Sequence, residues 1–325
     1  MPRLIKPDRN NREETLQALW RRLHLDDVVA KGLGLSVSML DHYIAKNNVP
    51  AASVSAKGLS SDMTCAALLA RWTGQANADD LLRRAFSCVY WRTELEFTDR
   101  RVGNIDDKLR DDGLYELLDW QGLAAACDAA WFTDWVAPYL SNLFCSGGVL
   151  ANSLEFTVDS AARRFTETLQ AILVTRRWPN EVDAAAYGSY APLLTTVADP
   201  ASFNAALIDF CDYRVAQCFG YNGIDATKRR RPSQDASIMD RGGWDQAFPA
   251  ELFTLKHAYE QATGKPLSLN AAHPLLQSRL MTAPFPALLP LHEDEVSARL
   301  QKLGMSTFGD QWKLRQPVLA RYLPA

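Results

Sequence analysis

The stretch DPASFNAALIDFCDYRVAQCF, residues 199–219, decides the fold class of this chain. Asp199 is a favourable N-cap, and Pro200 follows at the first helical position, where its missing N–H would have no intrahelical partner. Apolar side chains then recur at i, i+4, i+7, i+8, i+12 and i+15, namely Phe203, Leu207, Phe210, Cys211, Val215 and Cys218. This period of about 3.6 residues predicts an amphipathic helix over residues 199–219.

The same helical period recurs along most of the chain, and no segment shows the convincing alternation of a strand. An aromatic-rich stretch between Tyr115 and Phe144 has helical spacing in its second part, which is far more typical of a core than of a ligand site. The sequence therefore predicts an all-α fold, a multi-helix bundle of about a dozen helices with no significant sheet. Further helices are expected over residues 36–46, 60–72, 77–100, 159–177, 249–263 and 293–303.

Length and composition describe an ordinary globular protein. The chain has 325 residues, of which 47% are hydrophobic and 22% charged, so it can bury a sizeable core. We expect an N-terminal helical sub-bundle over residues 1–150 and a C-terminal one over residues 151–325, packed as one continuous globule. The formal net charge of −3 gives no sign of the basic face of a nucleic-acid-binding protein. We therefore expect no nucleic-acid partner.

The N-terminal sequence MPRLIKPDRNNREE lacks the apolar region of a secretory signal. No stretch approaches the roughly 18 apolar residues of a membrane-spanning helix. None of the six cysteines forms a C-x-x-C pair, which favours small buried thiols in a reducing compartment. These features predict a cytoplasmic protein that does not insert into a membrane.

The sharpest candidate for chemistry is an aspartate-rich segment that contains Asp106, Asp107 and Asp111. Helical enzymes that ionise isoprenoid diphosphates hold magnesium with motifs of this kind, because carboxylates one helical turn apart share a face and bind hard cations. A second such motif, which these enzymes require, is missing, and Lys108 and Arg110 compete for the carboxylates. A metal-dependent helical enzyme is therefore an alternative, and a solvated charged helix end is favoured.

Other catalytic and metal-binding patterns are incomplete. His257 and Glu260 are spaced as a metal pair on one helix face, but a di-metal bundle needs a second pair and two more glutamates. The chain has no nucleophile elbow, phosphate-binding glycine-lysine loop or dinucleotide fingerprint. We expect no catalytic residue, no metal and no cofactor.

The segment over residues 221–248 interrupts the helical pattern for longer than a connection requires. It opens with the turn dipeptide Asn222-Gly223. Arginine and tryptophan are enriched at binding hot spots, and the segment concentrates both. It is therefore a candidate contact surface for a protein partner, and a disordered or self-packed insertion is an equally open interpretation. The candidate contact residues are Arg229, Arg230, Arg231, Arg241 and Trp244.

The second half of the chain resembles a known family. The shared features begin at Tyr190-Ala-Pro-Leu-Leu194 and continue with Asp199-Pro-Ala-Ser-Phe-Asn-Ala-Ala-Leu207, which leads into a helix with Tyr213 and Arg214. They continue with Pro249-Ala-Glu-Leu-Phe-Thr-Leu255 and Gly264-Lys-Pro-Leu267. In these segments the chain is similar to immunity protein 49, an all-helical family of the bacterial polymorphic toxin systems.

The resemblance implies a bacterial protein that neutralises a co-encoded toxin by direct stoichiometric binding. Such a protein needs no catalytic set, is cytosolic when it guards against a cytosolic toxin, and carries its specificity on surface loops. The expected partner is the cognate toxin protein. A helical protein-interaction scaffold is a further alternative.

Overall fold

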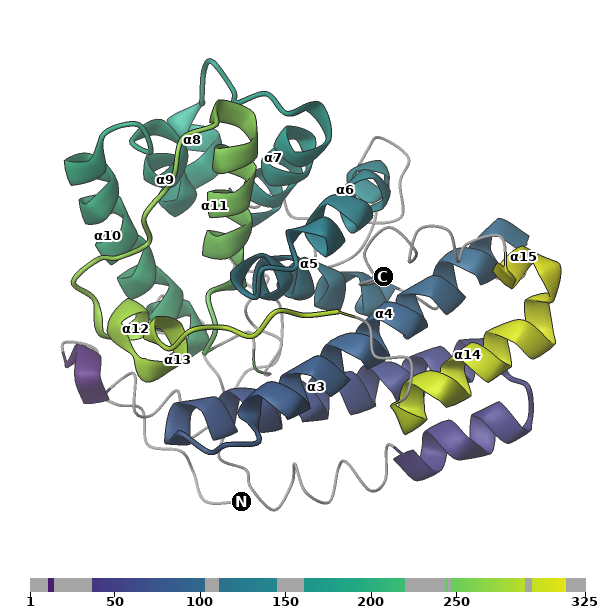
Figure 1. Cartoon of the computed structure of the whole chain (residues 1–325). Coiled ribbons are helices and arrows are strands. Elements are labelled where there is room, and N and C mark those ends of the chain that lie inside the picture. The colour runs from purple at the N-terminus through teal and green to yellow at the C-terminus, as the bar shows by residue number, and fades with distance from the viewer. Residues whose placement is uncertain are drawn as a thin grey trace. The chain divides into compact units, whose positions relative to one another are not determined.

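The structure is a computed structural model that describes residues 11–14, 37–102, 111–144, 161–219, 244, 247–289 and 294–313. Every regular element within these ranges is a helix, and no strand occurs in them (Figure 1). The expected all-α, multi-helix fold is confirmed.

The chain divides into two compact units. The first unit comprises Met1–Leu23 and Leu114–Pro284, and the second comprises His24–Gly113 and Phe285–Ala325. Each unit is thus assembled from two separate chain segments, which differs from the single division at residue 150 that the sequence suggested. The difference arises because α14 (Glu295–Phe308) packs against α4 (Ala78–Val102), far away in the sequence.

The second unit is built on two long helices. Helix α3 (Val49–Thr73) packs along α4, and α14 lies against both (Figure 1). A shorter helix over residues 37–45 precedes them, and α15 (Asp310–Lys313) follows α14. The buried hydroxyls of Ser87 and Ser297 lie 2.6 Å apart and join α4 to α14.

Helix α3 begins at Val49, well before the expected start at residue 60. The side chain of Asn48 accepts a hydrogen bond from the backbone N–H of Ala51 at 3.2 Å, and Pro50 occupies the first turn. Both are favourable at a helix start, and the apolar period alone did not reveal them. The expected end is confirmed, because Gly74 takes the left-handed conformation with φ 74° and closes the helix.

The first unit contains the remaining elements. Its central helix α7 (Ala161–Thr175) packs against both α6 (Ala130–Phe144) and α11 (Ala250–Thr263) (Figure 1). The expected helix over residues 199–219 is present as α10 (Pro200–Phe219), and the Asp199 side chain accepts from the Ser202 N–H at 3.1 Å. The other elements are α5 (Asp111–Ala126), α8 (Ala184–Tyr187), the 3₁₀ helix η3 (Gly188–Tyr190), α9 (Ala191–Thr195), α12 (Pro274–Gln277) and α13 (Arg279–Thr282).

Helix α5 approaches the start of α11 at Gly122. A Cβ atom built on Gly122 would lie 1.8 Å from the carbonyl oxygen of Ala250, far inside any van der Waals contact. The neighbouring atoms are backbone and cannot rotate away as a side chain can. The absence of a side chain at Gly122 is therefore a condition for the packing of α5 on α11.

We expect Gly122→Ala to lower the free energy of unfolding by about 1–3 kcal/mol or more, because the two helices must move apart. Gly58 is the matched control, since it lies inside α3 and is exposed. Gly58→Ala should be neutral or stabilise by up to about 1 kcal/mol through helix propensity. Urea unfolding of both variants measures the difference, and equal effects would contradict the close approach.

Candidate functional site

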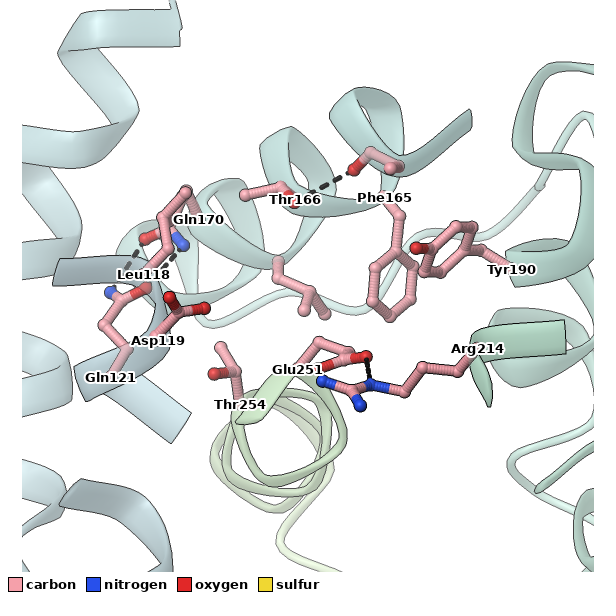
Figure 2. Close-up of a pocket in the computed structure, with 12 residues that line it drawn as sticks. Leu118, Asp119, Gln121, Phe165, Thr166, Gln170, Tyr190, Arg214, Glu251 and Thr254 are labelled. Carbon is pink, nitrogen blue, oxygen red and sulfur yellow. Dashed lines mark hydrogen bonds and ion pairs between the residues drawn. The ribbon is translucent and has the colours of Figure 1, made fainter. Parts of the chain in front are cut away.

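A pocket opens in the first unit among α5, α7, η3, α10 and α11 (Figure 2). It encloses about 520 Å³ of empty space, part of it open to solvent. Its lining is mixed, as in small-molecule sites, where apolar walls surround a few polar groups. The lining residues are Leu118, Asp119, Gln121, Ala162, Phe165, Thr166, Leu169, Gln170, Tyr190, Arg214, Glu251 and Thr254.

Two aromatic rings form one wall of the pocket. The ring centroids of Phe165 on α7 and Tyr190 at the end of η3 lie 4.7 Å apart, with the ring planes tilted by 32°. Tyr190 also contacts Phe210 and Tyr213 of α10, at centroid distances of 5.1 and 6.0 Å. The ring of Tyr190 is thus packed against both α7 and α10.

A buried ion pair forms another part of the lining. The Nε of Arg214 donates to Oε1 of Glu251 at 2.6 Å (Figure 2). Its Nη2 donates to the carbonyl oxygen of Phe248 at 3.0 Å. The Arg214 side chain is 1% exposed and that of Glu251 is 21% exposed. A guanidinium that is removed from water must be paired, so these bonds hold α10 to the first turn of α11.

Two buried amides join three helices beside the pocket. Gln121 of α5 and Gln170 of α7 donate to each other's side-chain oxygen, at 2.9 and 2.7 Å (Figure 2). The hydroxyl of Thr133 on α6 donates to the backbone carbonyl of Gln121 at 2.7 Å. Because each amide satisfies the other, removal of one leaves a buried polar group without its partner.

We expect Gln121→Met and Gln170→Met each to lower the free energy of unfolding by about 1–3 kcal/mol. The double variant should be destabilised by clearly less than the sum, because it leaves neither amide unpaired. A double-mutant cycle in urea measures this coupling. The control is Gln261→Met, because Gln261 lies on α11 at an exposed position. This variant should change the free energy of unfolding by less than about 0.5 kcal/mol. Additive single effects would show that the two amides are independent.

The predicted contact residues divide into two groups. Arg229, Arg230, Arg231 and Arg241 lie outside the described residues. Trp244 is 3% exposed, and its ring packs edge-on against Trp120 at 5.8 Å and tilted against Phe248 at 6.3 Å. Its side chain is therefore part of the core of the first unit, and its role in binding a partner stays a prediction.

The side chains of the aspartate-rich segment lie outside the described part of the structure. Asp106 and Asp107 lie outside the described part of the chain, and Asp111 begins α5 with a side chain that is likewise not described. Within the described ranges, no group of three or more His, Cys, Asp or Glu side chains could hold a metal ion. The magnesium-dependent alternative thus stays a prediction.

His257 and Glu260, which have the spacing of a metal pair, bind different partners. The Nε2 of His257 lies 3.0 Å from Oδ1 of Asp134 on α6, and the same oxygen accepts from Arg176 at 3.1 Å. Glu260 binds Lys256 and the backbone N–H of Leu267 instead. Burial alone would raise the pKa of Asp134, but the hydrogen bonds from His257 and Arg176 outweigh it and lower that pKa.

A second histidine–aspartate pair holds the end of the first unit together. The Nδ1 of His273 accepts from the backbone N–H of Leu275 at 3.1 Å and caps α12, while its Nε2 lies 3.2 Å from Oδ1 of Asp212. Asp212 also accepts from Arg12 near the N-terminus. The neutral ring with its proton on Nε2 satisfies both contacts. Burial lowers the pKa of His273 below its usual 6.5, although Asp212 acts in the opposite direction.

This geometry predicts a loss of stability on mild acidification. Below pH 6.5 the unfolded state binds a proton at His273 that the folded state does not bind. The free energy of unfolding therefore decreases as the pH is lowered from 6.5 toward the pKa of His273 in the folded state. We expect His273→Asn, which keeps a capping acceptor but does not titrate, to show a shallower decline between pH 7.5 and 5. Urea unfolding across this range gives both slopes, and identical slopes would refute the effect.

Cys211 directly precedes Asp212 and is buried, which makes its thiol unreactive. Burial raises the pKa of the Cys211 thiol to about 12, so the thiolate is scarce at neutral pH. Cys88 and Cys127 are also buried, and Cys65 is half-buried. For these four cysteines the structure agrees with the interpretation as small, mostly buried side chains.

Sequence reasoning missed the pocket as a site, although it had named much of its wall. The segments that carry the family resemblance include Tyr190, Arg214, Glu251 and Thr254 of the pocket lining. Arg214 was a usable signal for this site. It lies on the helix over residues 199–219, and a charge on the buried face of a helix requires a partner.

None of the described helices is both long and apolar enough to cross a membrane. Comparisons of the chain with protein-family models, with curated proteins and with solved structures found no match.

Proposed function

We propose that this protein is a cytoplasmic immunity protein that neutralises a co-encoded bacterial toxin by direct, stoichiometric binding. One observation carries the proposal beyond the resemblance of the sequence. Segments that carry the resemblance to immunity protein 49 meet around one pocket, to which they contribute Tyr190, Arg214, Glu251 and Thr254. Features that looked purely structural in the sequence thus share one location on the first unit.

The chemistry of this location suits binding to a protein. The pocket combines an aromatic wall with a partly exposed carboxylate on Glu251, and aromatic anchors with satisfied polar groups are typical of interface centres. Arg214 also binds the carbonyl of Phe248, which closes the predicted contact segment over residues 221–248. The pocket and one end of that segment are therefore fixed by the same side chain, which supports a shared binding surface.

The experiment is co-expression with the product of the neighbouring gene. We expect the protein to protect cells from that product and to co-purify with it in a fixed molar ratio, which light scattering after size exclusion measures. If the parent protein neither binds nor protects against it, the immunity proposal is wrong, and an uncharacterised helical enzyme becomes the better explanation.

The contact segment is tested by charge removal. We expect Arg230→Ala or Arg231→Ala to weaken toxin binding by about 2 kcal/mol, roughly 30-fold in Kd, if these side chains are hot spots. Arg177→Ala is the control, because Arg177 is exposed and lies outside the segment. Isothermal calorimetry measures the three affinities. Unchanged Kd values in both segment variants would exclude these two arginines from the interface.

Trp244→Ala is not a clean test of the interface. The side chain is buried against Trp120, so its removal leaves a cavity and should lower the free energy of unfolding by about 3–5 kcal/mol. A loss of protection by this variant would therefore report on folding rather than on contact with the toxin.

A further inference from the structure

We propose that the pocket of the first unit binds a neutral aromatic group of one ring, such as a phenol. The group belongs either to a free small molecule or to an aromatic side chain of a protein partner. Two properties of the lining lead to this inference, namely the pairing of its polar groups and its aromatic contacts. Neither property depends on the immunity proposal.

Each charged side chain of the lining already has a partner within the protein. Arg214 donates to the carboxylate of Glu251 at 2.6 Å and to the carbonyl oxygen of Phe248 at 3.0 Å. Asp119, the third charged residue of the lining, is not free either. An ion that enters the pocket would lose part of its hydration and would meet no counter-charge that lacks a partner. The lining therefore favours a neutral ligand over a cation or an anion.

Uncharged polar groups of the lining are bound in the same way. Gln121 and Gln170 donate to each other's side-chain oxygen at 2.9 and 2.7 Å. The hydroxyls of Thr166 and Thr254 each donate to the backbone carbonyl four residues earlier, at 2.9 and 3.3 Å. Because these groups are satisfied without a ligand, contact with the apolar wall contributes most to binding. A phenol hydroxyl both donates and accepts, so it can still bond to the lone pairs of the threonine oxygens.

A row of aromatic rings ends at the pocket. Phe210 and Tyr213 of α10 contact Tyr190 at centroid distances of 5.1 and 6.0 Å. Tyr190 in turn contacts Phe165 at 4.7 Å, and among the described residues no further ring continues the row beyond Phe165. The Phe165 side chain projects from α7 across the pocket toward α11 (Figure 2). A ligand ring beside Phe165 extends the row, and aromatic pairs are worth more than the area they bury.

The burial of the lining matches a ring that carries one polar group. Phe165 and Leu169 are at most 3% exposed, so the apolar wall lies deep in the pocket. Asp119, Thr166 and Glu251 are partly exposed and mark the side that is open to solvent. A phenol places its ring against the apolar wall while its hydroxyl stays near the partly exposed polar groups.

The test is calorimetric titration with phenol, cyclohexanol, benzoate and N-methylpyridinium. All four probes carry a six-membered ring, and they differ in aromaticity and charge. We expect phenol to bind with a Kd of about 1 mM or better. Cyclohexanol should bind at least about threefold more weakly because it lacks the aromatic contact, and the two ions at least about tenfold more weakly.

Three outcomes of these titrations would overturn the proposal. The first is no binding of phenol at about 10 mM. The second is binding of cyclohexanol as tight as that of phenol, which would show that the aromatic row does not select the ligand. The third is binding of benzoate or N-methylpyridinium as tight as that of phenol, which would show that the pocket does accept an ion.

Two variants locate the site. Thr166→Trp fills the pocket from its partly exposed side and should weaken phenol binding at least about tenfold. Its matched control is Thr175→Trp on the same helix, where the threonine makes the same type of bond, to Ala171 at 2.7 Å, but is exposed and outside the pocket. Circular dichroism confirms that both variants fold. Phenol binding that survives Thr166→Trp unchanged refutes the location.

A third variant tests the aromatic contact itself. Phe165→Leu keeps an apolar side chain at the end of the row but removes the ring. We expect phenol to lose its preference over cyclohexanol in this variant, because the ratio of the two affinities depends on the ring and not on the apolar volume. An unchanged ratio in the folded variant would show that Phe165 does not select an aromatic ligand.

The source of the ring is decided by a last comparison. N-acetyl-tyrosine amide carries the phenol on a blocked backbone, and 4-methylphenol is the same side chain without a backbone. Binding of the blocked tyrosine at least as tight as that of 4-methylphenol assigns the pocket to a protein side chain, and weaker binding assigns it to a free aromatic molecule. Because no toxin is present in these titrations, their outcome is independent of whether the chain protects against its neighbouring gene product.

Discussion

The buried guanidinium of Arg214 is the constraint on which the first unit depends. A charge with 1% exposure is tolerable only when it is bound, and both of its described partners belong to the start of α11 or the turn before it. The pair therefore fixes the position of α11 relative to α10. That position determines where Glu251 and Thr254 face the pocket, and it brings the carbonyl of Ala250 against α5. The apolar core supplies most of the burial energy, whereas Arg214 selects one arrangement of the helices.

The same principle operates at two aspartates of the first unit. Asp134 accepts from His257 and Arg176, and Asp212 accepts from His273 and Arg12. Each carboxylate joins parts of the chain that are far apart in sequence, and each meets one histidine and one arginine. The bond from Arg12 gives a physical reason why the N-terminal segment belongs to the same unit as α10. Loss of a carboxylate here would leave two donors without an acceptor, so these sites couple several elements at once.

The sequence predicted what local signals determine. Asp199 and Pro200 fix the start of α10, Gly74 fixes the end of α3, and the apolar period identifies the long helices. Long-range pairing could not be read in the same way. The partner of His257 is Asp134, 123 positions away, rather than the nearby Glu260 that has metal-like spacing. The two units depend on the same kind of long-range contact, because α14 packs against α4. The pocket draws on four helices and one 3₁₀ turn, and no single segment contains its pattern.

Trp244 shows how far residue type can locate a binding surface. Tryptophan is enriched at hot spots because it buries a large area and keeps one polar atom, and the same property suits it to a core. Composition therefore could not separate the two roles. In the first unit the ring lies against Trp120 and Phe248, four residues before the carbonyl that binds Arg214. Trp244 and Arg214 thus both contact Phe248. Trp244 therefore stabilises the turn that leads into α11, a structural role that residue type alone does not distinguish from a binding role.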